Sequence, residues 1–196
     1  MRTALLASLA LVACNKTPPV APAPPLEVLG QVPEFTLTDE SGKPFGSADL
    51  RGRAWVADTF FTSCPSICPK LTKIMSTLQS RLAETKLEAR LISISVDPDN
   101  DTPQVLKSYA SLNGADPKRW TFLTGPMDTI RAVAVGGFQS HVGKPQRTGN
   151  VMDIAHLGKL VLVDGRGRVR GYFDADLEGV DAVLDALRQL VTEPAS

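Results

Sequence analysis

Two cysteines with three residues between them lie in the segment FFTSCPSICPK, and each is followed by a proline. This spacing is one residue longer than the Cys-x-x-Cys spacing that is usual in redox proteins. If the chain becomes helical here, Cys64 and Cys68 lie on one face with Cα atoms about 6 Å apart, a separation that a disulfide tolerates. The two sulfurs can therefore close as a disulfide or open to hold one metal ion between them.

The position of the pair indicates which chemistry is favoured. Residues 54–61 are apolar and aromatic and predict a buried strand that leads directly into the cysteines, while Pro69 predicts the start of a helix. Amides at a helix N-terminus stabilise thiolates, so we expect lowered pKa values for both thiols. Thiolates select Cu(I), whereas a structural zinc site needs four ligands, and the folded part has no third cysteine. A disulfide closing so short a loop would add little stability.

The two histidines are the remaining candidate ligands. His141 lies in a Gly- and Lys-rich segment that predicts a surface loop, whereas His156 directly precedes an apolar strand. In a mixed sheet the His156 segment can lie beside the strand that ends at Cys64, which makes His156 a candidate third ligand, with a purely structural role as the alternative. Met75 belongs to a helical apolar stripe and is expected in the core.

The N-terminal segment predicts export and anchoring. Arg2 and an apolar run at residues 4–13 form a secretory signal that is too short to span a bilayer, and the run ends in LVAC, which resembles the lipobox of bacterial lipoproteins. We therefore expect a lipoprotein signal peptide at residues 1–13 and a lipidated Cys14 with a Pro/Ala-rich tether at residues 14–30. The domain would be membrane-anchored and face the periplasm or the cell exterior, an oxidising compartment.

Strands and helices alternate in the rest of the chain, which we expect to form one domain over residues 31–196. A hairpin is predicted at residues 35–45 and another around Asp164 to Gly167. Buried strands are predicted at residues 54–61, 89–96 and 120–124, and helices from Pro69, from Pro103, around Ile130 and from Leu177. The fold class is therefore α/β, with a mixed central sheet flanked by helices on both sides and an N-terminal hairpin. Basic and acidic residues both total 21, so no basic field suggests nucleic acid as a partner.

Four motifs together resemble the Sco/SenC family of thioredoxin-fold copper proteins. They are FFTSCPSICP, SVDPDNDTP with the following LKSYA, RWTFLTG and DIAHLGKLVLVDGRGRV, which span residues 31 to about 191. The resemblance implies a thioredoxin-like fold and copper bound by Cys64, Cys68 and His156. It also implies a role in assembling the CuA site of cytochrome c oxidase, with an oxidase subunit or another copper protein as partner. The family pattern has acidic residues where Ser66 and Ala155 stand here, which leaves less negative charge around the ion.

Three other functions can be weighed from the same residues. A thiol–disulfide reductase of this fold would act on cysteines of an oxidase subunit or other exported protein, but it would carry a proline where Gly158 stands. A peroxidase would need proline and Thr or Ser where Val56 and Phe61 stand. The third alternative is a lipoprotein whose disulfide only stiffens a loop. We expect a copper-binding chaperone rather than an enzyme, with thiol–disulfide exchange as the second hypothesis because both begin from the same thiolates.

Overall fold

One mixed sheet of eight strands forms the centre of the protein. The computed structural model describes residues 24–193, apart from residues 66, 145, 149–150 and 156–157. The sheet has the strand order β1-β10-β9-β4-β5-β6-β2-β3, and a separate two-stranded sheet pairs β7 with β8. The strands are β1 (Gly30–Gln31), β2 (Thr36–Asp39), β3 (Pro44–Gly46), β4 (Trp55–Phe60), β5 (Arg90–Ser95), β6 (Trp120–Thr124), β7 (Gln146–Thr148), β8 (Val151–Asp153), β9 (Lys159–Val163) and β10 (Arg168–Asp174).

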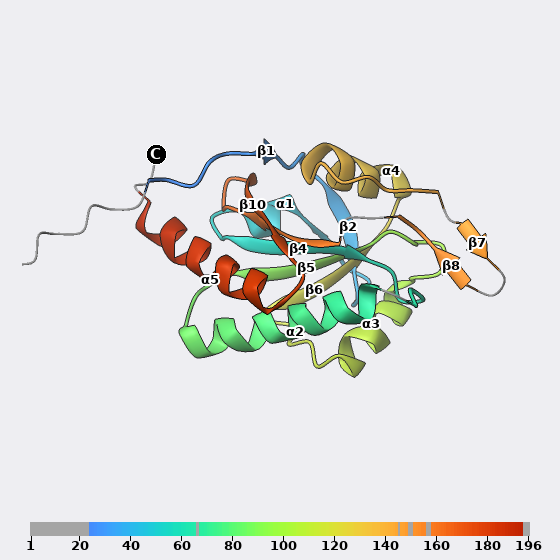
Figure 1. Cartoon of the computed structure of the whole chain (residues 1–196). Helices are drawn as coiled ribbons and strands as arrows, with labels where there is room; N and C mark the ends of the chain where they lie inside the picture. Colours follow the sequence, from blue (N-terminus) through green and yellow to red (C-terminus); the bar gives the residue numbers. More distant parts are fainter. Residues whose placement is uncertain (1–23, 66, 145, 149–150, 156–157, 194–196) are drawn as a thin grey trace, which may run out of the picture.

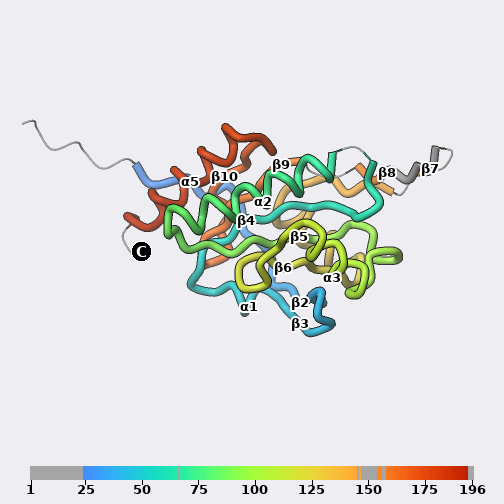
Figure 2. The backbone as a smooth tube through the Cα atoms, turned by 90° about the horizontal axis from the view of Figure 1, so that it is seen from below, coloured from blue at the N-terminus to red at the C-terminus, as the bar shows by residue number. Residues whose placement is uncertain are grey.

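Helices cover both faces of this sheet. They are α1 (Ser47–Leu50), α2 (Ile67–Thr85), α3 (Pro103–Leu112), α4 (Met127–Arg131) with a π-helical continuation at Ala132–Gly137, and α5 (Leu177–Thr192). Figure 1 shows α2, α3 and α5 on one face and α4 on the other, and in Figure 2 α2 lies between α5 and α3. The predicted mixed sheet, its flanking helices and the N-terminal hairpin of β2 and β3 are confirmed.

The strands β4, β5 and β6 are parallel, and antiparallel pairs extend the sheet on both sides. β4 pairs with β5 in parallel and with β9 in antiparallel fashion, and β5 pairs with β6 in parallel. The N-terminal ends of β4, β5 and β6 therefore lie together at one end of the sheet, and their C-terminal ends lie together at the opposite end. The segment that carries the cysteines follows β4 at the edge opposite to the two ends of the described chain (Figure 1).

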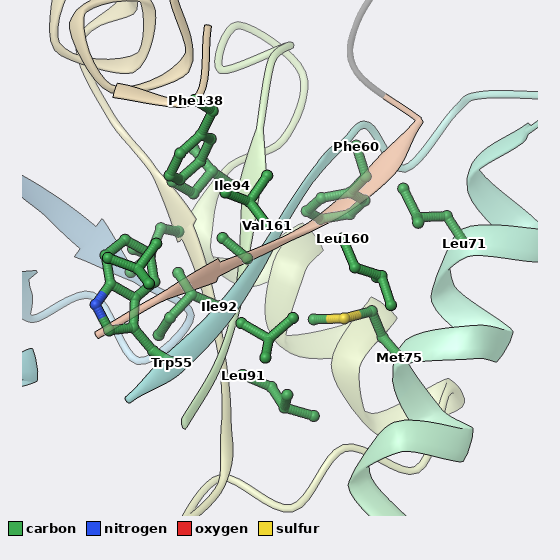
Figure 3. Close-up of a cluster of buried hydrophobic side chains, with 14 of the residues drawn as sticks. Trp55, Phe60, Leu71, Met75, Leu91, Ile92, Ile94, Phe138, Leu160 and Val161 are labelled. Carbon is green, nitrogen blue, oxygen red and sulfur yellow. The ribbon is translucent and has the colours of Figure 1, made fainter. Parts of the chain in front are cut away.

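The core occupies both sides of β4 and β5, because both faces of these strands are covered. All residues of β4 are buried, including the polar Asp58 and Thr59, as expected for a central strand that is covered on both faces. On one side the ring of Trp55 lies 6.0 Å from that of Phe138. On the other side Leu71 and Met75 of α2 are fully buried among Leu91 and Leu160 (Figure 3). The prediction that Met75 is a core residue is confirmed.

The structure also differs from the secondary structure predicted from the sequence at several places. α2 begins at Ile67 rather than at Pro69, so Pro69 lies in the first helical turn, where its missing N–H is tolerated. Strand β1, helix α1, the π-helical segment and the β7-β8 hairpin had no clear sequence signal. His141 is exposed in a loop, as expected. No helix within the described part of the chain is long and apolar enough to cross a membrane.

Candidate metal centre

The two cysteines lie together where β4 ends and α2 begins. Cys64 and Cys68 are 5 % and 1 % exposed, and both are thiols rather than halves of a disulfide. Their side chains are hydrogen-bonded to each other. Cys68 is in the first turn of α2, whereas Cys64 lies in the preceding turn, where its N–H donates to the Phe61 carbonyl at 3.2 Å. Because only Cys68 lies in the helix, the pair is not a regular helical i, i+4 pair, but the two hydrogen-bonded sulfurs are close enough to bind one ion.

A buried carboxylate holds the turn before Cys64 in place. Asp101 is 0 % exposed and accepts hydrogen bonds from the Thr62 backbone N–H at 3.1 Å and from the Thr62 hydroxyl. It also accepts one from the Ser95 hydroxyl at 2.5 Å. Since Ser95 ends β5, Asp101 ties the cysteine turn to the neighbouring strand. The sequence reasoning missed this role, although Asp101 belongs to the SVDPDNDTP motif.

Asp97, which belongs to the same SVDPDNDTP motif, forms its hydrogen bonds within its own loop. Its side chain accepts from the Asn100 amide at 3.0 and 2.9 Å, and its carbonyl accepts from the backbone N–H groups of Asn100 and Asp101. These bonds close the turn at residues 97–101, which follows β5. Asp97 is thus occupied by the turn, and Asp101 is the carboxylate that reaches the cysteine segment.

A second buried carboxyl lies on β4 itself. Asp58 is 1 % exposed, and burial raises its pKa to about 7 although a hydrogen bond from Ser93 lowers it. Its Oδ1 has no hydrogen-bond partner among the described residues. A lone carboxyl in such surroundings gives up its charge near neutral pH. The signal was present in the sequence as an aspartate inside an otherwise apolar strand, WVADTF, and it was overlooked.

The environment of Cys68 raises its pKa. Burial is the largest cause, the hydrogen bond with Cys64 and the charges of Cys64 and Asp58 act in the same direction, and a backbone hydrogen bond from Phe61 opposes them. The prediction of a lowered pKa at a helix N-terminus is therefore wrong for Cys68, because burial outweighs the helix dipole. The thiol form is favoured, so a metal ion that binds here must displace a proton from the sulfur.

An aromatic side chain from the LKSYA motif packs near the thiols. The Tyr109 hydroxyl is hydrogen-bonded to the Thr72 hydroxyl at 2.8 Å, and its ring lies 5.4 Å from that of Phe60. Burial raises the pKa of Tyr109, and the charges of Cys68, Asp58 and Cys64 add to the effect. Tyr109 is thus within electrostatic reach of the cysteines.

Gly158, the residue before β9, lies beside the start of α2. β9 is antiparallel to β4, with Val161 opposite Ala57, so the residues before β9 approach the end of β4. A Cβ on Gly158 would lie 2.6 Å from Cδ1 of Ile67, which is adjacent to Cys68. His156 itself lies outside the described residues, as do Ser66 and Cys14. In the part of the chain that the structure describes, no three His, Cys, Asp or Glu residues group as a metal site.

Exposed apolar residues alternate in sequence with the buried cysteine segment. Ile67 is 40 % exposed, and Pro65 and Pro69 are also exposed. An exposed apolar patch of this kind is typical of a surface that another protein contacts. A partner that docks on it would meet the thiols directly behind it.

The family comparison covers nearly the whole described domain. The family model described as SCO1/SenC matches residues 27–192. A SCO1/SenC family lipoprotein from Bacillus anthracis is 34% identical with a TM-score of 0.73, and the match covers 82% of this chain and 95% of that one.

Two further solved structures add functional descriptions of the proteins concerned. BsSco, a member of the Sco family of cytochrome c oxidase assembly proteins in which a disulfide switch was identified, is 30% identical with a TM-score of 0.75, covering 87% of this chain and 100% of its own. Copper-bound ScoI from Bradyrhizobium japonicum is 28% identical with a TM-score of 0.68, covering 82% and 99%.

Proposed function

The chain belongs to the SCO1/SenC family, and from that premise we propose that it is a copper-binding chaperone for the CuA site of cytochrome c oxidase. We infer that Cys64, Cys68 and His156 hold the copper ion. The observation that carries this proposal is the pair of hydrogen-bonded thiols at the end of β4, beside the segment that leads into β9. Copper bound to ScoI and the oxidase-assembly role of BsSco support it.

The chemistry of the two sulfurs suits a transferable Cu(I) ion. Thiolate ligands are soft and select Cu(I) over harder cations. Because burial favours the thiol form of Cys68, binding copper releases protons, and returning a proton to the sulfur assists release of the ion. Three ligands leave room for a ligand from the receiving protein, which a closed four-ligand site would not. Transfer would proceed as the partner's ligands replace the sulfurs one at a time.

The apolar patch of Pro65, Ile67 and Pro69 would form the docking surface for the receiving protein. These residues are exposed next to thiols that are almost completely buried. A partner that covers the patch excludes water from the sulfurs while the ion moves, which strengthens the interactions between the ion and its incoming ligands. The receiving protein would be the oxidase subunit that carries the CuA site or another copper protein.

The N-terminal segment would place this site outside the cytoplasm. Residues 1–13 would be removed as a signal peptide, Cys14 would carry lipid, and residues 14–30 would tether the domain of residues 31–196 to a membrane. The Bacillus anthracis relative is itself a lipoprotein, which supports the assignment. In that compartment Cys64 and Cys68 can also oxidise to a disulfide, which would switch copper binding off.

A thiol–disulfide reductase is the less favoured function. Attack on a disulfide requires a thiolate, and the raised pKa of Cys68 keeps that sulfur protonated at neutral pH. Gly158 occupies the sequence position where a reductase of this fold carries proline. The thiol pair is therefore better suited to accept an ion than to exchange disulfides.

Copper titration of the reduced full chain tests the proposal. We expect one Cu(I) per chain, sulfur scattering in the X-ray absorption spectrum, and loss of binding in Cys64→Ser and Cys68→Ser. His156→Ala should remove the nitrogen contribution from the spectrum and weaken copper binding. The matched control His141→Ala, which changes an exposed loop histidine, should leave the spectrum and the affinity unchanged. Failure of the reduced chain to retain copper would refute the chaperone, and an unchanged spectrum for His156→Ala would remove that residue from the ligand set.

A further inference from the structure

A large basic cavity lies at the end of the sheet opposite to the cysteines. Its volume is about 860 Å³, and it is lined where β4, β5 and β6 begin and where β9 turns into β10, by residues such as Ala54, Ala89, Arg119 and Gly165. The cysteines follow the other end of β4, whose six residues span about 20 Å. The cavity is thus a separate site from the candidate copper centre.

Cations predominate in the lining of this cavity. Seven basic residues line it: Arg53, Arg90, Lys118, Arg119, Arg166, Arg168 and Arg170. Four acidic residues line it as well, of which Asp164 and Glu193 form ion pairs with Arg168 and Arg170, leaving Glu88 and Asp116. The other five cations form no ion pair with any described residue. The lining therefore has an excess of about three positive charges in a chain whose net charge is zero.

Arg53 and Arg90 repel each other in this lining. Burial lowers the pKa of Arg90 and the charge of Arg53 adds to the lowering, while the charges of Glu40, Asp116 and Asp49 oppose it. The Arg90 Nε is buried and has no hydrogen-bond partner among the described residues, while its Nη2 donates to the Thr121 hydroxyl at 2.7 Å. An anion in the cavity would relieve this repulsion. Guanidinium groups match the geometry of phosphate oxygens especially well.

One wall of the same cavity is apolar. Leu87, Leu187, Leu190 and Val191 line it, and Val191 is 75 % exposed. A fully hydrated inorganic anion gains nothing from such a wall. The combination of arginines and leucines instead suits a ligand that has a negative headgroup and an apolar body.

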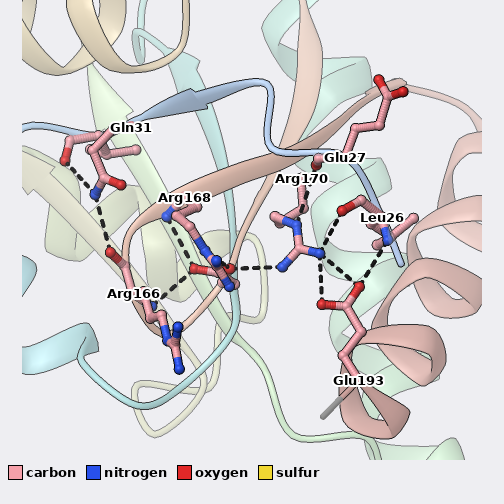
Figure 4. Close-up of polar contacts among 9 residues, drawn as sticks. Leu26, Glu27, Gln31, Arg166, Arg168, Arg170 and Glu193 are labelled. Atoms are coloured by element: carbon pink, nitrogen blue, oxygen red, sulfur yellow. Dashed lines mark hydrogen bonds and ion pairs between the residues drawn. The ribbon is translucent and has the colours of Figure 1, made fainter. Parts of the chain in front are cut away.

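The N-terminal segment leaves the domain at the rim of this cavity. The Leu26 N–H donates to Glu193 at 2.8 Å, and Arg170, which is 5 % exposed, donates to the Leu26 carbonyl at 2.7 Å and to Glu193 at 2.6 Å (Figure 4). These contacts fix the point at which the tether meets the domain. If Cys14 carries lipid, the anchored end is the end with the basic cavity.

We propose that this cavity binds the phosphate headgroup of an anionic phospholipid. Arg53, Arg119 and Arg166 contact the phosphate, and the leucine wall contacts the glycerol and the first acyl carbons. This binding turns the basic end of the domain toward the membrane and the cysteines away from it, toward a partner. The charge and shape of the cavity carry the proposal, which depends neither on copper nor on lipidation of Cys14.

Titration with a short-chain lipid below its micelle concentration tests the proposal on the full, reduced, copper-free chain. Dihexanoyl phosphatidylglycerol should bind saturably, shift the amide resonances of Ala54 and Arg90, and leave those of Cys64 and Cys68 unchanged. Replacing Arg53 and Arg119 together by Gln should weaken binding by roughly tenfold or more, because each charge-assisted contact contributes on the order of a tenfold factor. Lys73→Gln, which neutralises an exposed cation of α2 outside the cavity, is the matched control and should bind normally.

Each alternative result has a definite meaning. Equal binding of dihexanoyl phosphatidylcholine would overturn recognition of the anionic headgroup. Inorganic phosphate binding as tightly as the lipid would assign the cavity to a soluble anion and overturn the membrane role. Absence of saturable binding, or an unchanged affinity in the double arginine variant, would overturn the site altogether. None of these results depends on whether the copper titration succeeds.

Discussion

The two ends of the sheet bury charge in opposite ways. At the end where β4 begins, Arg170 is buried between two carboxylates, with ion pairs of 2.8 Å to Asp164 and 2.6 Å to Glu193. Along β4 toward the cysteines, Asp58 is buried without a cation and accepts a hydrogen bond from Ser93. Burial acts on both groups, but the paired one keeps its charge throughout the neutral range, whereas Asp58 becomes protonated as the pH falls through about 7.

The pKa shifts follow this contrast. Burial opposes ionisation of Asp164, yet hydrogen bonds from Arg170 and Arg168 lower its pKa below the ordinary value. The same burial raises the pKa of Asp58 to about 7, because the hydrogen bond from Ser93 offsets only part of it. The comparison teaches that an oppositely charged side chain nearby, rather than the extent of burial, decides whether a buried group is charged. The basic end is consequently a fixed electrostatic structure, and the thiol end is one that can lose or gain protons.

The largest effect is expected at the paired end. Arg170→Ala would leave Asp164 and Glu193 without their shared cation, and removing one partner of a buried ion pair typically costs about 3–5 kcal/mol. The change should lower the free energy of unfolding in urea by that amount. Because Arg170 also holds Leu26, amide exchange near Leu26 should accelerate.

Arg188→Ala is the matched control for this prediction. Arg188 pairs with Asp185 on the surface of α5, where both side chains are more than half exposed. Its removal should change the stability by less than about 1 kcal/mol. A similar loss in the two variants would show that the buried network contributes no more than a surface pair, which would remove the proposed contrast between the ends.

The second-largest effect on stability is expected at Asp58, the buried carboxyl that has no cation beside it. Folding raises the pKa of Asp58 from 3.8 to about 7, so the folded state holds a proton that the unfolded state has released. The stability contributed by this group is fully present below about pH 4 and is lost as the pH rises to about 7. Three pKa units correspond to about 4 kcal/mol, from which the cost of burying an amide is subtracted. Asp58→Asn should therefore stabilise the copper-free protein by roughly 2–3 kcal/mol at pH 8.

The pH dependence distinguishes this mechanism from a simple packing change. Urea unfolding from pH 4 to pH 8 should show a smaller decline in stability for Asp58→Asn than for the wild type. Asp99→Asn, at an exposed position in the loop after β5, should retain the wild-type decline. Parallel curves for the wild type and Asp58→Asn would mean that Asp58 is already ionised in the folded protein.

The sequence predicted features that depend on local pattern. The mainly apolar runs located β4, β5 and β6, and the Asp-Gly-containing turn located the β9-β10 hairpin within a residue or two. Short elements such as α1 and the π-helical segment could not be predicted, because contacts with distant residues rather than their own sequence stabilise them. The cysteine pair was found by spacing alone.

The surroundings of the cysteines could not be predicted in the same way. Whether burial or the helix dipole dominates at Cys68 depends on α2, β4 and Tyr109 packing together, which no spacing reports. The role of Asp101 likewise depends on two segments that meet only in the folded sheet, Thr62 and Ser95. The basic cavity collects arginines from four different parts of the chain, so a composition with no net charge concealed it.

The smallest effect is expected where a buried carboxylate has hydrogen bonds but no cation. Asp101→Asn keeps the shape of the side chain and one acceptor oxygen, but it places an amide N–H₂ against donors of Thr62 and Ser95. The loss of one such hydrogen bond should cost about 1–2 kcal/mol of stability. The effect should be local, because Asp101 joins only the cysteine turn and the end of β5.

Amide hydrogen exchange measured residue by residue would resolve that locality. In Asp101→Asn the N–H groups of Thr62 and Cys64 should exchange at least about tenfold faster than in the wild type, a factor that corresponds to about 1.4 kcal/mol. Those of Arg90 and Gly52, which are bonded to the Ala54 and Gly165 carbonyls at the basic end, should exchange at the wild-type rate. Equal acceleration at both ends would mean that the sheet opens as one unit, so that the thiol end has no separate flexibility with which to admit and release an ion.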